Sequence, residues 1–326
     1  MEVKLYLREA IGLIVKTMPF IWIRLGTYAL LGLGVAVYLA VAGGVAWLLG
    51  QALSLLGVIV FLIALGGAWM LVQWAQRYFF YLLQAAHIAV MTEYIVYGEA
   101  PKGSQVQYGR QQVQQRFRDT SVMFAADEII DGIVKGINRS FAQLTQILPI
   151  PNLDNLNAIV ERVSKFATTY IDEAILSRAY QYREQNVWAV AQDGVILYAQ
   201  AWKPVLANAV ALTVINYLEM AVVLVILGIP AIILGALIPI AAIRTLLGVF
   251  VIVGVWMFKL AVSDAYAMAA TLLAYHRSTE GMEPNPEWQE RLTGISEQFR
   301  NLCDRAANAV SGQEKAESEP RNQTDY

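Results

Sequence analysis

The chain has 326 residues and a net charge of −2, with 57% hydrophobic and 15% charged residues. Soluble domains average about 25% charged residues, so this composition predicts a membrane protein. Nucleic acid is disfavoured as a partner because phosphate binding requires a clustered basic surface. The single cysteine, Cys303, excludes a disulfide framework or a thiolate metal cluster.

Residues 1–26 are predicted to form an amphipathic N-terminal helix, with Pro19 kinking it or marking its junction with the first membrane crossing. Basic residues lie among its apolar positions, without the compact apolar core and cleavage site of a removable signal peptide. By the positive-inside rule they place this end in the cytoplasm. These residues are Lys4, Arg8, Lys16 and Arg24.

The first membrane segment, 27–100, contains most of the longest uncharged run, the 52 residues from Leu25 to Gln76. About 20 apolar residues cross a bilayer core of about 30 Å, so this run predicts two crossings. Both must be helical, because lipid offers no partner for backbone amides. The turn is expected between Gly50 and Ser54.

Small residues recur every four positions on the first crossing, at Ala36, Ala40 and Gly44. In lipid, such a face allows helices to approach closely. We interpret it as packing within the chain in preference to the alternative, a dimer interface.

Residues 78–97 fit either a third crossing or a cytoplasmic continuation of the second helix. The ionisable side chains of His87 and Glu93 make a lipid-facing crossing costly. We therefore favour the continuous helix and a total of four crossings, with six as the alternative.

The segment 101–200 is predicted to be a cytoplasmic connector of amphipathic helices. Apolar residues recur at helical spacing over 122–148 and again over 156–175. The first of these helices carries acidic residues where a membrane-surface helix would carry Lys and Arg. Contact with protein is therefore expected, and Asp193-Gly194 is expected to form a turn.

The second membrane segment, 201–284, is predicted to form another hairpin that turns between Gly228 and Pro239. Residues 285–326 are predicted to form a short helix and then, from about residue 304, a disordered polar tail. The two membrane segments resemble each other, since Pro19 and Pro101 are spaced much like Pro204 and Pro284. A parallel internal repeat or a similarity of hydropathy alone would each explain this.

Ionisable and polar residues at membrane depth are the candidate site residues. The four main candidates are expected to share one intramembrane polar site, in which Arg244 pairs with the Glu219 carboxylate. The three weaker candidates lie on the second helix of each hairpin. A structural role is the alternative for all of them. The main group is Asn208, Asn216, Glu219 and Arg244, and the weaker group is His87, Glu93 and Asp264.

No catalytic motif is present in the sequence. Two histidines and one cysteine cannot supply an HExxH or cysteine-pair zinc site. Neither a Gly-x-Ser-x-Gly elbow nor a P-loop occurs. We therefore expect no enzymatic activity, no cofactor and no metal.

The run from Gln192 to Asn208 (QDGVILYAQAWKPVLAN), followed by two long apolar helices, resembles the C-terminal part of choline-transporter-like membrane proteins. In that family an Asp-Gly turn leads into an amphipathic helix that ends in Asn and is followed by a membrane hairpin. The resemblance covers at most 90 residues, within 192–284, and implies transport of a small solute. The chain is equally similar to short prokaryotic membrane families with a duplicated hairpin.

The sequence thus predicts an all-α integral membrane protein of the prokaryotic plasma membrane, with two transmembrane hairpins and both termini in the cytoplasm. The leading hypothesis is a non-enzymatic scaffold or assembly protein that forms homo-oligomers or contacts other membrane proteins through its connector. The alternative is a transporter or channel for a small solute or ion.

Overall fold

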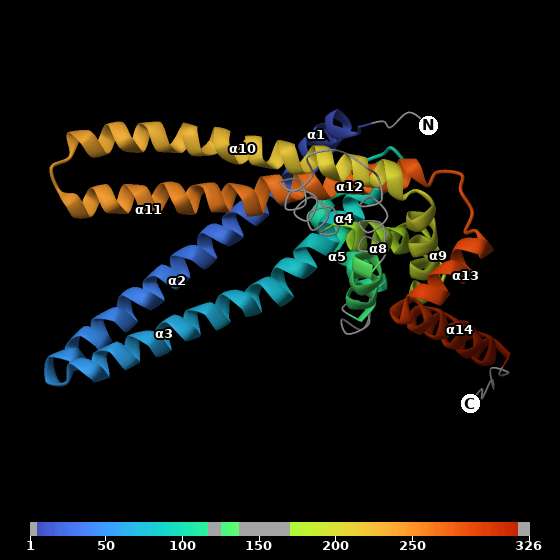
Figure 1. Cartoon of the computed structure of the whole chain (residues 1–326), viewed down its shortest axis with the longest axis horizontal. Coiled ribbons are helices and arrows are strands. Elements are labelled where there is room, and N and C mark those ends of the chain that lie inside the picture. The colour runs from blue at the N-terminus through green and yellow to red at the C-terminus, as the bar shows by residue number, and fades with distance from the viewer. Residues whose placement is uncertain (1–4, 117–124, 137–169, 319–326) are drawn as a thin grey trace, which may run out of the picture. The chain divides into compact units, whose positions relative to one another are not determined.

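The computed structural model describes residues 5–116, 125–136 and 170–318, and all regular secondary structure within these ranges is helical. The chain divides into two units. Unit 1 comprises 1–16, 88–218 and 266–326, and unit 2 comprises 17–87 and 219–265. The predicted all-α fold is confirmed (Figure 1).

The first hairpin consists of α2 (Met18–Ala52) and α3 (Ser54–Ala75), joined by the extended residue Leu53. The turn therefore lies within the predicted range. A short helix, α1 (Leu7–Lys16), ends just before α2, and Pro19 occupies the first turn of α2, where a missing N–H costs nothing. Pro19 thus marks the predicted junction.

The second helix of this hairpin continues past its apolar part. A π-helical turn, η1 (Gln76–Phe80), leads directly into α4 (Tyr81–Val96). The resulting helix from Ser54 to Val96 has 43 residues. Its length is about 65 Å, twice the hydrocarbon thickness, which agrees with a continuous helix and not with a separate third crossing.

Small residues mark the contact between α2 and α3, and one of the closest approaches lies near the turn. A Cβ atom on Gly57 would lie 2.5 Å from the Ala46 carbonyl oxygen and 2.8 Å from the Gly50 Cα atom. Ala64 and Ala68 of α3 are also buried. Small residues do hold this hairpin together, but they are not the ones that we expected.

The face formed by Ala36, Ala40 and Gly44 is exposed. Our interpretation that it packs within the chain was therefore wrong. The helix face that meets α3 includes Ala46 instead, which lies almost on the opposite side of the helix from Gly44, because two steps of about 100° separate them by about 160° the shorter way round. The exposed face is left open to lipid or to a second protein.

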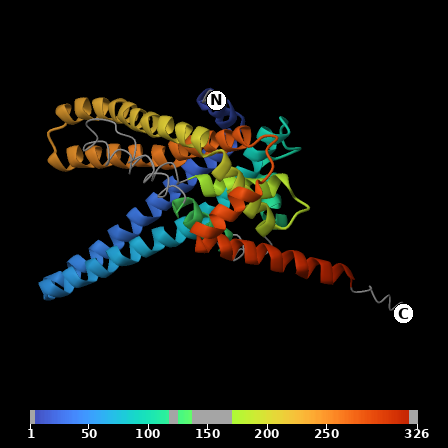
Figure 2. The ribbon, with the colours of Figure 1, turned by 45° about the vertical axis from the view of Figure 1, so that its right-hand side comes forward.

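The second hairpin repeats this plan (Figure 2). It consists of α10 (Trp202–Leu237) and α11 (Ala241–Phe258), and the π-helical turn η2 (Lys259–Ser263) leads into α12 (Asp264–Ser278). Of the predicted turn region, Ile238 and Pro239 lie in the turn. Pro230 is inside α10, because a membrane helix tolerates proline where its neighbours satisfy the freed backbone groups.

The two halves share details that hydropathy does not dictate. Each π-helical turn falls in the second helix of its hairpin, and η2 begins 183 residues after η1. Gly98 and Gly281, also 183 residues apart, follow the long helices with φ of 75° and 71°. A positive φ is the usual end of a helix at glycine. These matches favour a true internal repeat over a similarity of hydropathy alone.

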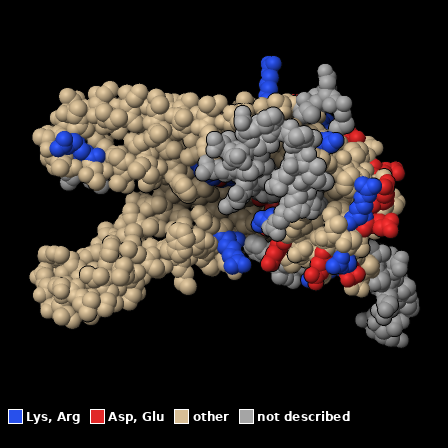
Figure 3. All heavy atoms as spheres, viewed as in Figure 1, with Lys and Arg blue, Asp and Glu red and all other residues tan. Residues whose placement is uncertain are grey.

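Four helices have the length and composition of membrane spans: Met18–Ala52, Ser54–Val96, Trp202–Leu237 and Ile243–Ser278. Large apolar side chains cover their exposed surfaces, which in water would be prohibitive. Charged side chains gather over unit 1 and are nearly absent from the visible faces of the hairpins (Figure 3). The protein is an integral membrane protein.

Unit 1 has an apolar core of its own. Its further helices are α5 (Gln105–Arg116), α8 (Ile171–Gln181), α9 (Val187–Gln200), α13 (Pro286–Ile295) and α14 (Glu297–Ser318), and residues 125–136 are also helical. The core includes fully buried side chains from three helices, among them Ile175, Leu197 and Phe299. Most of the predicted connector hairpin lies in 117–124 and 137–169, outside the described residues.

The expected turn at Asp193-Gly194 was wrong, since both residues lie within α9. A Cβ atom on Gly194 would lie 2.8 Å from Ile175 Cγ2 and 3.1 Å from the Tyr275 hydroxyl oxygen. The Tyr275 hydroxyl donates a hydrogen bond to the Gly194 carbonyl at 3.0 Å. Glycine is required here for close helix packing and not for a turn.

The C-terminal segment also differs from the expected disordered tail, because α14 extends to Ser318. Phe299, Leu302 and Ala306 are buried along one side of this helix, which packs against α9. Arg305 lies over the Trp188 ring of α9 at 5.0 Å. Asp304, Arg305 and Asn308 lie on the exposed face of this amphipathic helix, and the prediction for residues 319–326 lies outside the described part of the chain.

Candidate functional site

The candidate site in unit 2 is a polar layer around η2. Lys259 donates hydrogen bonds to both carboxylate oxygens of Asp264, at 2.8 and 3.1 Å. The predicted candidate Asp264 is therefore ion-paired within its own helix. π-Helical turns occur often at functional sites because they displace side chains from regular α-helical positions. In η2 the displaced residues include Lys259 and Ser263.

Glu219 is the residue of this layer whose carboxylate is least balanced by neighbouring polar groups. It lies on α10 beside the Ser263 hydroxyl, which is almost completely buried. The Oε2 atom of Glu219 is buried and makes no hydrogen bond to any described residue. A carboxylate with an unused buried oxygen can accept a proton or a ligand donor.

Arg244 does not lie near Glu219. Its side chain packs beside Gly235, where a Cβ atom would lie 3.6 Å from Arg244 Cγ. Gly235 follows Glu219 by 16 residues on the same helix, a separation of about 24 Å. The expected ion pair between Glu219 and Arg244 is therefore not formed.

The two candidate asparagines belong to unit 1. Asn208 accepts a hydrogen bond from the Tyr6 backbone N–H at 3.0 Å and donates one to the Pro204 carbonyl at 2.9 Å. It therefore anchors the N-terminal segment. Asn216 is also buried, and its amide nitrogen makes no hydrogen bond within the described chain.

His87 forms a buried contact in unit 2. Its Nε2 atom lies 2.9 Å from the Thr17 hydroxyl oxygen, and its ring stacks on Phe20 with the centroids 4.6 Å apart. The interaction joins the end of the first hairpin to its beginning, across 70 positions of sequence. We assign His87 a packing role.

Glu93 belongs to a polar clamp in unit 1. It accepts hydrogen bonds from the Tyr108 hydroxyl at 2.5 Å and from Arg183 Nη2 at 2.6 Å. Burial and the hydrogen bond to Glu93 raise the pKa of Tyr108 to about 12, so the phenol stays a donor at neutral pH. The clamp ties α4 to α5 and to the end of α8.

A buried Ser177–His276 pair was not predictable from sequence, because 99 residues separate the two. Ser177 Oγ lies 2.7 Å from His276 Nε2 and donates its only hydrogen to the Ala174 carbonyl. The histidine must then donate to the serine oxygen, which is the reverse of the proton transfer that activates a serine nucleophile. The pair is not an activated dyad.

An acidic cluster lies on α8 in the same unit. Burial, together with the neighbouring Glu173 carboxylate, raises the pKa of Asp172 well above its usual range. A proton held between the two carboxyl groups removes their mutual repulsion. Across the described residues, no group of three His, Cys, Asp or Glu side chains is placed to hold a metal ion.

No family model, curated protein or solved structure matches the chain.

Proposed function

We propose that this is a non-enzymatic assembly protein of the membrane, which forms homo-oligomers through the exposed face of α2. The observation that supports this proposal is a row of small residues on the lipid-exposed side of that helix. The row is Gly32, Ala36, Ala40 and Gly44, spaced every four residues and exposed throughout.

No residue that the structure describes packs closely on the glycines of this row. Nothing lies within 4 Å of a Cβ atom placed on Gly32 or Gly44, and the contact with α3 uses a different face. Apolar side chains gain little from leaving lipid for protein, so membrane helices associate where small residues let their backbones approach. A second α2 helix fits this face.

The helices of unit 1 are the part of the protein that we propose to contact partners, on the cytoplasmic side. Basic residues before α2 and Arg77 after α3 support a cytoplasmic position for both ends of the first hairpin, by the positive-inside rule. The plasma membrane of a prokaryote remains our proposed location.

Ala40→Leu is expected to shift the full-length protein from oligomer toward monomer in bilayers. A bulky side chain on a close-approach face costs about 1–3 kcal/mol, which lowers the association constant about 5- to 150-fold. Cross-linking at a series of protein-to-lipid ratios measures this change. Val41→Leu is the control, because Val41 is also exposed but lies off the row.

A wild-type protein that stays monomeric at every protein-to-lipid ratio would refute the assembly proposal. Equal loss of oligomer in the Ala40→Leu and Val41→Leu variants would show that the small residues do not form the interface.

Transport is the second candidate function, favoured by the unused Oε2 atom of Glu219. The resemblance to choline-transporter-like proteins supports it only in part, because Asp193 and Gly194 do not form the turn typical of that family. This alternative predicts uptake of choline or of protons into vesicles that contain the purified protein. Glu219→Gln is expected to abolish that uptake, and Glu283→Gln, in unit 1, to preserve it. Uptake equal to that of protein-free vesicles rules transport of these solutes out.

A further inference from the structure

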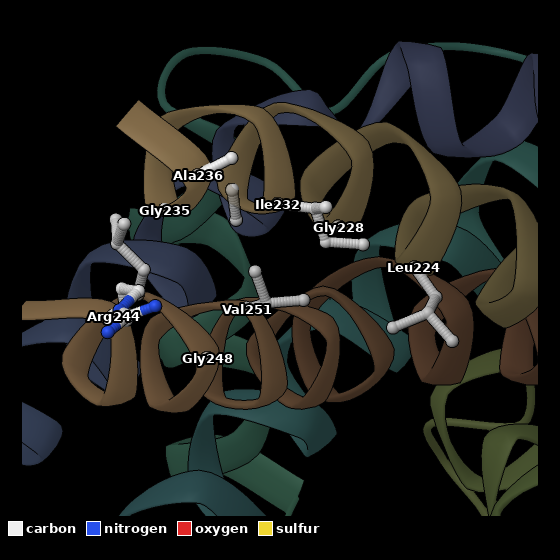
Figure 4. A pocket seen from close by; sticks show the side chains of 10 residues that line it. Leu224, Gly228, Ile232, Gly235, Ala236, Arg244, Gly248 and Val251 are labelled. Carbon is white, nitrogen blue, oxygen red and sulfur yellow. The ribbon is translucent and has the colours of Figure 1, made fainter. Parts of the chain in front are cut away.

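The face of the second hairpin carries a groove between α10 and α11 that no role described above uses. Its volume is about 490 Å³. Leu224, Gly228 and Gly235 line it from α10, and Arg244, Gly248 and Val251 line it from α11 (Figure 4). Apart from Arg244, every lining side chain is apolar or absent. We call it the hairpin groove.

The hairpin groove has the length of one membrane leaflet. Leu224 and Gly235 are 11 positions apart on α10, which corresponds to about 16 Å along the helix. Half of the hydrocarbon core is about 15 Å. An acyl chain lying along α10 therefore fits the groove from one end to the other.

The hairpin groove exists because glycines without side chains line it, and two of these glycines are not in close contact with a neighbouring helix. A Cβ atom on Gly228 or on Gly248 would meet nothing within 4 Å. A larger side chain at either position can therefore enter the groove without displacing the backbone of the hairpin.

Arg244 marks one end of the groove. Its side chain is exposed, lies beside Gly235, and forms no ion pair with any residue that the structure describes (Figure 4). The other basic residue of α11 and η2, Lys259, is 15 positions away, or about 22 Å. Both side chains must extend outward to reach opposite headgroup layers of a core of about 30 Å.

A guanidinium at this depth requires an anionic partner, because an unpaired charge at membrane depth is costly. Glu219, on the other helix of the hairpin, is about 24 Å along α10 from the level of Arg244. A long side chain near the end of a membrane helix extends toward the headgroup layer, so Arg244 is expected to reach the level of the lipid phosphates. Guanidinium groups bind phosphate through two parallel hydrogen bonds, so the partner is matched in geometry as well as in charge.

We propose that the hairpin groove binds one acyl chain of an anionic glycerophospholipid, whose phosphate pairs with Arg244. The site is complete within one chain, so it does not depend on the proposed oligomer. Zwitterionic lipids offer the same acyl chain and phosphate, but their cationic headgroup offsets the phosphate charge, so Arg244 is expected to bind an anionic lipid more tightly.

Native mass spectrometry of the full-length protein tests this site. The protein is released into mild detergent from bilayers containing equal amounts of phosphatidylglycerol and phosphatidylcholine. Wild type is expected to retain one phosphatidylglycerol per chain with about tenfold preference, the size of effect that one charge-assisted contact supplies. Arg244→Gln is expected to lose the preference, and Gly248→Leu to lose the bound lipid by filling the groove.

Arg77→Gln is the matched control, because Arg77 is an exposed basic residue of the same unit outside the groove. It is expected to retain lipid like wild type, and circular dichroism checks that all variants keep their helical content. Wild-type retention of phosphatidylglycerol in Arg244→Gln would overturn the proposal. So would equal retention of both lipids by wild type, or a loss of oligomer instead of lipid in Gly248→Leu.

Discussion

Gly57→Ala is expected to destabilise the first hairpin by about 1–3 kcal/mol, the usual cost of forcing an extra methyl group into a closely packed contact. The new Cβ atom would lie 2.5 Å from the Ala46 carbonyl oxygen and 2.8 Å from Gly50 Cα. Both are backbone atoms, which a rotamer change cannot move aside. Thermal unfolding in detergent, followed by circular dichroism, measures the loss.

Gly66→Ala is the matched control in the same helix, because nothing lies within 4 Å of a Cβ atom there. Replacing this helical glycine is expected to be neutral or to stabilise by up to about 1 kcal/mol. If both variants unfolded at the wild-type temperature, the close contact between α2 and α3 would be contradicted.

Phe299→Ala is expected to destabilise unit 1 by about 3–5 kcal/mol and to release α14 from α9. Phe299 is completely buried, and its removal leaves a cavity at the start of α14. Limited proteolysis reports the release as rapid cleavage within 297–318. The control is Ile295→Ala, which removes a side chain that is 65% exposed.

Equal protection of the Phe299→Ala variant and wild type from protease would mean that α14 does not depend on this contact. Cleavage of wild type after residue 304 at the rate of an unfolded peptide would instead show that this segment is disordered, as predicted from the sequence.

Membrane spans were predictable because their signal is local. An uncharged run long enough for two bilayer crossings is expected to form a helical hairpin. The turn at Leu53 was predictable because Gly, Gln and Ser are concentrated around it. The second turn was harder to place. Gly228 and Pro230 look like helix breakers in sequence, but α10 continues through both to Leu237.

Features that depend on a neighbouring helix were not predictable. Gly194 resembles a turn residue, and only the position of Ile175 and Tyr275 explains why it is glycine. Ala36, Ala40 and Gly44 do form one helix face, but sequence alone does not tell which partner that face meets. The π-helical turns likewise have no composition that distinguishes them from the α-helix around them.

The candidate site residues show the same limit. Sequence singled out ionisable and polar side chains, and the structure assigns partners to Asn208, His87, Glu93 and Asp264. Three of these four have a partner at least 70 positions away. Glu219 and Arg244 were expected to form a pair, and they lie at different levels of the hairpin because helix rise separates them.

The account depends on both hairpins lying in the bilayer, with residues 101–200 on the same side as the two chain ends. Single cysteines at Ser54, in the first turn of α3, and at exposed Ser104, in a chain with Cys303→Ser, test it directly. A membrane-impermeant maleimide applied to intact cells is expected to label the cysteine at position 54 and to reach the one at position 104 only after permeabilisation. Labelling at position 104 in intact cells, or release of the protein from membranes without detergent, would contradict this topology.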